Sequence, residues 1–348
     1  MTPRRSQSRR SLTARGRARA AALVVTGLTA AALLAGCGSQ SAAGTESGPI
    51  TIAYSAWPGW FPLAVAEEKG FFDAEGVDVN LKFFNDYTAS IDALNAGQVD
   101  ANAETLNDTI ASVATGADLQ IVINTDFSAG NDAVIVDKSI TSIEDLKGKK
   151  VAAEAGVVDH FLLLQGLKTK GLAEKDLQFR ALPTDAAAAG FAGGQFDAVA
   201  VFAPFTVQAL KRPGSHVLFS SKDYPGTIPD HIVFSKSVVD ARPDDIQKIV
   251  NAWYKTIDFI KTNPDEANAI MAKQAGISTA EYAGLVAGTD LLDATRAAAA
   301  FVKSDAPTSL PTTAAIINPF LVSAGLTKTE APLDGLFAPQ FTDAVASK

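Results

Sequence analysis

Residues 96–101 read AGQVDA, and residues 193–198 read GGQFDA. Each stretch joins a glycine that can end a helix to the first residues of an apolar strand. The segments before each stretch also follow one order, which is strand, helix, strand and helix. This recurrence predicts two lobes built on the same plan.

The segments around these two stretches alternate between strand and helix patterns. Those expected in the first lobe are strands at 50–54, 79–84 and 99–103 and helices at 61–69 and 88–96. Those expected in the second lobe are strands at 151–153, 177–182 and 196–201 and helices at 159–170 and 184–192. The alternation predicts an α/β protein with two doubly wound lobes and largely parallel strands. Ligands of such sheets bind at the carboxyl ends of the strands, so a shared cleft is expected.

The second lobe interrupts the first. An apolar strand at 133–136 leads out of the first lobe, and a strand at 232–234 leads back. Lobe 1 is therefore expected to hold residues 49–136 and 235–348, and lobe 2 residues 137–234. The two crossings form a hinge, and the main helices expected after it, which should pack on lobe 1, are 246–262, 264–274, 279–287 and 312–324.

The first 36 residues predict an export signal. Seven arginines and no acidic residue precede an apolar run at 20–35, which is too short to span a membrane. The run ends in Leu-Ala-Gly-Cys37, which resembles the lipobox of bacterial lipoproteins. Cys37 would carry the lipid, and residues 37–48, which are small and polar, would form a flexible tether to the cell membrane. Arg9 and Arg10 leave the Sec and twin-arginine export routes both open.

Charge and cysteine content narrow the possible partners. Removing the leader with its seven arginines leaves 23 basic residues against 38 acidic ones, a net charge of about −15. Nucleic acid is therefore not expected as a partner. Cys37 is the only cysteine, so stability must come from a buried core and not from disulfides.

Five short motifs, in this order and spacing, resemble one family across residues 50–340. They are EEKGFF at 67–72, ALNAGQVD at 93–100, DFSAGNDA at 126–133, IEDLKGKKV at 143–151 and GQFDA at 194–198. The family is that of the type II periplasmic binding proteins of nitrate, sulfonate, taurine and bicarbonate importers, including binders of thiamine-pyrimidine precursors. The resemblance implies a monomeric protein that closes over a small solute and docks on an ABC permease driven by an ATPase.

Residues just past the strand ends are the predicted ligand contacts. In the first lobe they are Trp57, Trp60, Asp86, Tyr87, Glu104, Thr105, Asn107, Asp108, Ser128 and Asn131. In the second lobe they are Glu154, Asp159, His160, Phe202 and Pro204. The two tryptophans would be costly to expose, so they line a pocket or fold back as local core. Helix capping is the alternative role for Asp86 and Asp159, and a place at the edge of the core is the alternative for His160.

Two classes of solute remain open. The family implies a small anion such as a sulfonate, taurine or nitrate, held by N–H groups at helix N-termini. Sulfonate-binding members often have a Gly-Ser pair before the second-lobe histidine, whereas this chain reads GVVDH at 156–160. The candidates also include several carboxylates and no lysine or arginine, which favours a nitrogen-rich cationic or neutral solute.

An enzyme is the competing class, because one branch of this fold makes a thiamine precursor with pyridoxal phosphate. That chemistry requires a cytosolic chain, whereas the lipobox-like sequence indicates export. The sequence also contains no nucleophile elbow, Walker loop or dinucleotide fingerprint. His160, His216 and His231 lack zinc-site spacing. We therefore expect no catalytic residue, cofactor or metal. A third class is a secreted interaction or signalling lipoprotein that uses the same fold.

Overall fold

The computed structural model describes residues 48–348. The predicted signal peptide, Cys37 and all but the last residue of the predicted tether lie outside this range. Among the described residues, none of the helices combines the length and the apolar character that a membrane span needs.

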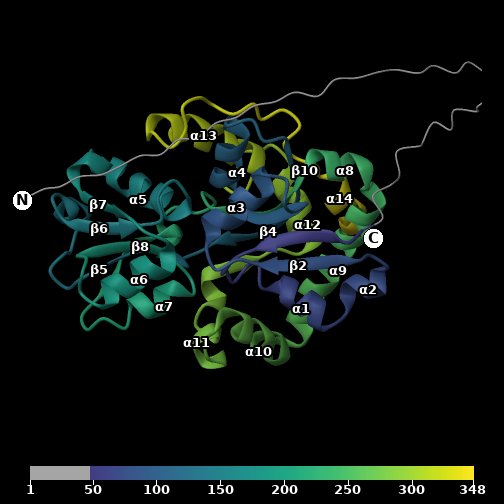
Figure 1. Cartoon of the computed structure of the whole chain (residues 1–348), viewed down its shortest axis with the longest axis horizontal. Helices are drawn as coiled ribbons and strands as arrows, with labels where there is room; N and C mark the ends of the chain where they lie inside the picture. The colour runs from purple at the N-terminus through teal and green to yellow at the C-terminus, as the bar shows by residue number, and fades with distance from the viewer. Residues whose placement is uncertain (1–47) are drawn as a thin grey trace, which may run out of the picture. The chain divides into compact units, whose positions relative to one another are not determined.

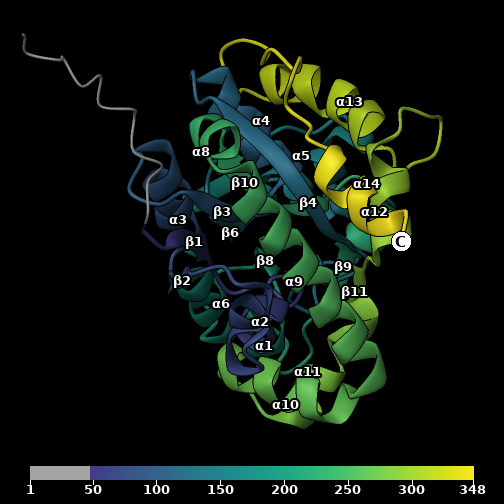
Figure 2. The same cartoon turned by 90° about the vertical axis from the view of Figure 1, so that its right-hand side faces the viewer.

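The first lobe contains a six-stranded sheet in the order β11-β4-β10-β3-β1-β2 (Figures 1 and 2). Its strands are β1 (Ile50–Tyr54), β2 (Val79–Phe83), β3 (Ala101–Thr105), β4 (Leu119–Ser128), β10 (Pro229–Ser235) and β11 (Thr289–Leu291). The second lobe contains a five-stranded sheet in the order β7-β6-β8-β5-β9. Its strands are β5 (Asp132–Val136), β6 (Lys150–Ala153), β7 (Gln178–Ala181), β8 (Ala198–Phe202) and β9 (His216–Ser220).

The two sheets share one topology. In each, the first strand of the repeated unit lies between two parallel partners, which are β2 and β3 around β1 and β7 and β8 around β6. The next strand is antiparallel, β10 beside β3 in one sheet and β5 beside β8 in the other. Both sheets are therefore mixed, and the expectation of largely parallel strands was wrong at the strands that cross between the lobes. β5 and β10, which enter their sheets from the hinge side, run antiparallel to both of their neighbours, and the edge strand β11 is also antiparallel to β4.

The strand pairing moves both predicted lobe boundaries. β5, which was expected to end lobe 1, pairs with β8 and β9 in the second sheet. β10, which was expected to end lobe 2, pairs with β3 and β4 in the first sheet. The crossings therefore lie at 129–131 and 221–228. The ten-residue β4 had been missed, because its last residues, from Asp126 to Ser128, were interpreted as a turn.

The repeated stretch that defines the lobes has the same structure in both. Gly97 and Gly194 end their helices with φ angles of 66° and 78°, a conformation that favours glycine. Asp100 then accepts a hydrogen bond from the Thr51 N–H at 2.7 Å, and Asp197 accepts one from the Lys150 N–H at 2.9 Å. Both aspartates thus bind the backbone of the first strand of the repeated unit, β1 or β6, at the end away from the cleft.

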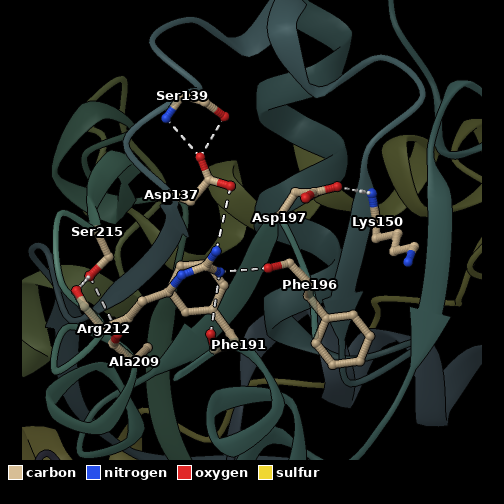
Figure 3. A network of polar contacts seen from close by, with 9 residues as sticks. All are labelled: Asp137, Ser139, Lys150, Phe191, Phe196, Asp197, Ala209, Arg212 and Ser215. Atoms are coloured by element: carbon tan, nitrogen blue, oxygen red, sulfur yellow. Dashed lines mark hydrogen bonds and ion pairs between the residues drawn. The ribbon is translucent and has the colours of Figure 1, made fainter. Parts of the chain in front are cut away.

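Arg212 anchors this region further in the second lobe. Its guanidinium donates to the carbonyl oxygens of Phe191 and Phe196 at 3.3 and 2.6 Å and lies 3.6 Å from the Asp137 carboxylate (Figure 3). It also lies over the Phe191 ring, 4.7 Å from the centroid. One side chain therefore holds together a helix end, a strand start and the first residue after β5.

Helices cover both faces of each sheet (Figures 1 and 2). Those of the second lobe are α5 (Val158–Thr169), α6 (Thr184–Ala192) and α7 (Phe205–Ala209). Those before the crossing in the first lobe are α1 (Pro62–Glu68), α2 (Phe71–Glu75), α3 (Tyr87–Asn95) and α4 (Leu106–Ala114). Those after it are α8 (Lys236–Ala241), α9 (Pro243–Thr262), α10 (Pro264–Ala275), α11 (Thr279–Ala283), α12 (Ala294–Phe301), α13 (Leu310–Ser323) and α14 (Gln340–Ala346).

The late helices do not all stay on the first lobe. α12 and α14 lie against β4, and α9 packs on α1 and α2, as expected for lobe 1. α13 instead bridges the lobes, because it packs on α4 and also places Phe320 against Phe161 of α5, with ring centroids 5.3 Å apart. Part of the second lobe is therefore supported from the C-terminal segment.

Candidate functional site

A small cavity lies where the two lobes meet at the ends of their strands. Its lining residues are Trp57, Trp60, Tyr87, Thr105 and Asp230 from the first lobe and Asp132, Val158 and Phe202 from the second. Its volume is about 10 Å³, which is room for about one water molecule. A larger solute therefore requires the lobes or the lining side chains to move.

Aromatic rings form one wall of this cavity. Trp57 meets Phe202 edge-on across the lobes, with centroids 6.4 Å apart, and Tyr87 meets Phe202 similarly at 6.0 Å. Trp60 packs on Tyr87 at 5.4 Å. Both predicted tryptophans thus lie at the cavity, on the loop between β1 and α1, where the rings present apolar faces to the space between the lobes.

Three aspartates lie in or beside the lining of the same cavity. Asp230 and Asp132 line the cavity, and Asp126 accepts a hydrogen bond from the Trp57 indole N–H at 3.1 Å. Asp126 and Asp230 are neighbours in register on β4 and β10. All three side chains are at most 1% exposed. Within residues 48–348, neither oxygen of Asp230 has a hydrogen-bond partner, and one oxygen of Asp132 lacks one.

Burial changes the acidity of these carboxyl groups. Desolvation, together with repulsion between the aspartates, raises the pKa of Asp126 to about 7 and that of Asp230 well above its ordinary value. Desolvation also raises the pKa of Asp132 to about 7, against the lowering effect of a hydrogen bond from Ser128. No lysine or arginine among the described residues is buried, so these carboxyl groups have no internal cation to pair with.

Gly59 makes the position of Asp126 possible. A Cβ atom at residue 59 would overlap the Asp126 carboxylate, so only glycine permits this loop and this strand to approach so closely. The loop then delivers the Trp57 indole N–H to the carboxylate.

A second polar cluster supports Tyr87. The Tyr87 hydroxyl donates to Asp108 at 2.8 Å and accepts from the Thr105 N–H at 3.0 Å. Thr105 also donates to Asp108 at 2.7 Å, and the Asn107 amide donates to the other Asp108 oxygen at 2.6 Å. Desolvation raises the pKa of Asp108 to about 8. These four predicted residues lie together, with Tyr87 and Thr105 at the cavity and the other two behind them.

Glu154 connects the lobes. One of its oxygens accepts from the N–H and hydroxyl of Thr88 on α3, at 3.1 and 2.5 Å. The other accepts from the N–H and hydroxyl of Thr184 on α6, at 3.1 and 2.7 Å. Thr184 also contacts Asp159 at 3.1 Å, and desolvation and nearby carboxylates raise the pKa of Asp159 well above its usual range. Glu154 and Asp159 thus lie beside the cavity and not in its lining.

Three of the predicted ligand residues point elsewhere. Asp86 is exposed and caps α3 by accepting from the Ala89 N–H at 3.0 Å, which was its alternative role. His160 stacks on Phe179 at 4.6 Å and pairs with Glu174 at 2.7 Å, so it belongs to the edge of the second lobe's core. Glu104 is buried under α4, where it accepts from Asn102 and Thr109. These three side chains lie outside the cavity lining, because position after a strand does not determine side-chain direction.

Three other predicted ligand residues also lie outside the cavity lining, two of them at or beside the crossings. Ser128, the last residue of β4, and Ser221, the first residue of the second crossing, share a hydrogen bond of 2.6 Å. Asn131 donates to the Leu285 carbonyl oxygen at 2.7 Å and to the Thr289 hydroxyl at 2.8 Å. Pro204 lies at the N-terminus of α7, beyond the cavity. Ser128 and Asn131 thus position the hinge and not the cavity wall.

Three residues that line the cavity were not among the predicted ligand contacts, namely Asp132, Val158 and Asp230. Asp132 stood in a quoted motif that was interpreted as a turn. Nothing in the sequence marked Asp230 as a site residue, because it lies inside β10, and β10 was expected to end lobe 2. In the range 48–348, no three His, Cys, Asp or Glu side chains are grouped closely enough to hold a metal ion.

Two mixed sheets, two crossings and an interlobe cavity define the type II periplasmic binding protein fold. The alkanesulfonate-binding protein SsuA from Xanthomonas axonopodis pv. citri, solved with bound MOPS, has this fold with a TM-score of 0.70, covering 83% of this chain and 98% of that chain. Its sequence identity to this chain is 18%, so the likeness is one of fold.

Sequence comparison gives the family. The family model described as NMT1/THI5 like matches residues 57–267, and the chain belongs to this family. A Brucella abortus (strain 2308) protein named "Putative binding protein" is 26% identical over 231 residues, 65% of this chain and 71% of that protein. A Bacillus subtilis (strain 168) protein named "Putative aliphatic sulfonates-binding protein" is 27% identical over 241 residues, 68% and 73% of the two chains. These relatives are named as binding proteins, in agreement with the expectation that this chain is not an enzyme.

Proposed function

We propose that this protein is the extracytoplasmic solute-binding component of an ABC importer, and that its solute is a small nitrogen-rich cation such as a guanidinium or amine compound. The family and the two-lobed fold support the transport role. The solute class goes beyond what the names of the relatives say, and it rests on the side chains of this chain.

The observation that carries the proposal is the group of Asp126, Asp132 and Asp230 beside the aromatic wall. Buried carboxylates without a cationic partner are costly, and a cation placed among them would remove that cost. The faces of Trp57 and Phe202 would add cation–π attraction. A sulfonate at the same place would meet carboxylates on one side and no basic side chain on the other.

Ligand titrations at two pH values test this solute class. Guanidinium, urea, taurine and nitrate are each titrated by calorimetry at pH 6 and pH 8. We expect guanidinium to bind and to bind more tightly at pH 8, because a cation requires the carboxyl groups whose pKa is about 7 to be ionised. Binding of taurine or nitrate alone would overturn the cation and retain the transport role. Binding of urea with no dependence on pH would favour a neutral solute.

Cys37 supplies the proposed membrane attachment. Its lipobox-like context supports lipidation, with residues 37–48 as a tether between the membrane and a monomeric body. Mass spectrometry of the protein purified from membranes tests this: a diacylglyceryl adduct is expected on Cys37, and an unmodified, soluble mature chain would contradict it.

A further inference from the structure

Glu154 lies between the N-termini of two equivalent helices, α3 of the first lobe and α6 of the second. Each helix follows the second strand of the repeated unit, β2 or β7, and precedes the glycine of the repeated stretch. The Glu154 carboxylate is 5% exposed and accepts four hydrogen bonds, two from Thr88 on α3 and two from Thr184 on α6. Two of the four hydrogen bonds therefore cross from one lobe to the other.

The position suits a negative charge. The first N–H groups of a helix lack partners within the helix, and the helix dipole adds positive potential there. Two such ends and two hydroxyls converge on one carboxylate, which gives it hydrogen-bond donors without a lysine or arginine. A solute anion would be attracted to the same donors, but here the side chain of the protein occupies them.

We propose that Glu154 is an internal anion that latches the closed lobes and excludes anionic solutes from the helix N-termini. The latch rests on the proposed function in one respect, since closure of the lobes is what captures a solute. The difference between the two helices supports the assignment. α3 has its own cap, Asp86, whereas α6 begins after Pro183, which has no side-chain oxygen, and relies on Glu154.

The latch is tested first without any solute, in the full-length protein. Glu154→Gln keeps the shape of the side chain but replaces one acceptor oxygen with an NH₂ group. That group cannot accept the hydrogen bonds that Thr88 or Thr184 donates at this position. Thr88→Val removes only a hydroxyl contact that crosses the lobes. Asp185→Asn is the matched control, because Asp185 is exposed in the first turn of α6 and its only side-chain hydrogen bond is to the neighbouring Ala186 N–H.

Tryptophan quenching reports on opening, because Trp57 and Trp60 lie at the lobe interface while Trp253 is buried in α9. We expect the acrylamide quenching constant to rise about twofold or more in Glu154→Gln, less in Thr88→Val, and not at all in Asp185→Asn. Small-angle scattering should show a matching increase in radius of gyration, while far-UV circular dichroism stays unchanged. If both interlobe variants remain as compact and as protected as the wild type, the latch is wrong.

Anion exclusion is tested with methanesulfonate as the probe. Glu154→Ala frees the helix N-termini, so we expect it to bind methanesulfonate at least tenfold more tightly than the wild type does. Equal affinity in the two proteins would overturn the exclusion. Guanidinium titration of the wild type runs in parallel: if guanidinium fails to bind while Glu154→Gln still opens the lobes, the proposed solute is wrong and the latch stands.

Discussion

The N-terminus of α3 in the first lobe and that of α6 in the second occupy the same place in their lobes, but their surroundings differ. α3 is capped by Asp86, and α6 by Glu154. Far from the cleft, Asp100 and Asp197 make equivalent hydrogen bonds to the first strand of the repeated unit in each lobe. The repeated unit is therefore preserved where it holds a strand in place and has diverged where the lobes face each other.

The same contrast holds for charge and for aromatic surface. The first lobe brings Asp126 and Asp230 to the cleft, together with the two tryptophans. The second lobe brings one carboxylate, Asp132, and one ring, Phe202. Neither lobe alone surrounds the cavity, so solute selection depends on their meeting.

The largest expected effect comes from removing a carboxylate of the cavity. Asp230→Asn should weaken guanidinium binding by about 100-fold or more, because losing one partner of a buried charge pair costs about 3–5 kcal/mol. Calorimetry at pH 8 measures the change. Asp258→Asn, on the exposed face of α9, is the control and should bind like the wild type. Unchanged binding in Asp230→Asn would place the solute elsewhere.

The pH dependence of stability comes next. Asp126 and Asp132 have folded-state pKa values of about 7, above those of the unfolded chain, so the folded protein holds more protons between pH 4 and 7. The free energy of unfolding should therefore fall as pH rises through this window, by up to about 1.4 kcal/mol per pH unit for each group. Denaturant titrations from pH 4 to pH 8 measure the slope. Asp126→Asn should reduce it, and a slope that is unchanged or of opposite sign would contradict the assignment.

The paired aspartates away from the cleft give a smaller effect. Asp100→Ala should lower the free energy of unfolding by about 1–2 kcal/mol, and Asp197→Ala by less. The Thr51 N–H that pairs with Asp100 is partly buried, whereas the Lys150 N–H that pairs with Asp197 is exposed to water. If urea unfolding shows the same loss of unfolding free energy in both variants, exposure of the hydrogen bond does not determine its contribution.

The smallest effect belongs to the helix-ending glycines. Gly97→Ala and Gly194→Ala meet no atom within 4 Å of the added Cβ, so their cost is the left-handed backbone alone, about 1 kcal/mol each. Thermal unfolding of both variants should show equal shifts. Unequal shifts would mean that the two copies of the stretch are not equivalent.

The repeated plan could be predicted from sequence because it is local. The glycine caps and alternating segments around residues 97 and 194 follow from short-range propensity. Strand direction and sheet membership could not, since they depend on how β5 and β10 pair with residues far away in the chain. An apolar run such as 133–136 fits either sheet equally well.

The site was predicted only in part, because some of its residues are set by local sequence and others by long-range pairing. Trp57, Tyr87 and Phe202 could be predicted to lie at the cavity, because large aromatic side chains next to strand ends are unfavourable when exposed to water. His160 and Glu104 followed the same rule of position, yet local partners turn them away. Asp230 lies at the site because the register of β10 against β4 places it beside Asp126. That register is a property of the folded sheet.

Gly59 has a consequence for comparing relatives. Since any side chain at this position would overlap the Asp126 carboxylate, the two residues cannot be substituted independently. Across related chains we expect them to covary, with a larger residue at the first position accompanied by a smaller or displaced residue at the second. Such a pair offers a marker, readable from an alignment, for members that place a carboxylate beside the cleft.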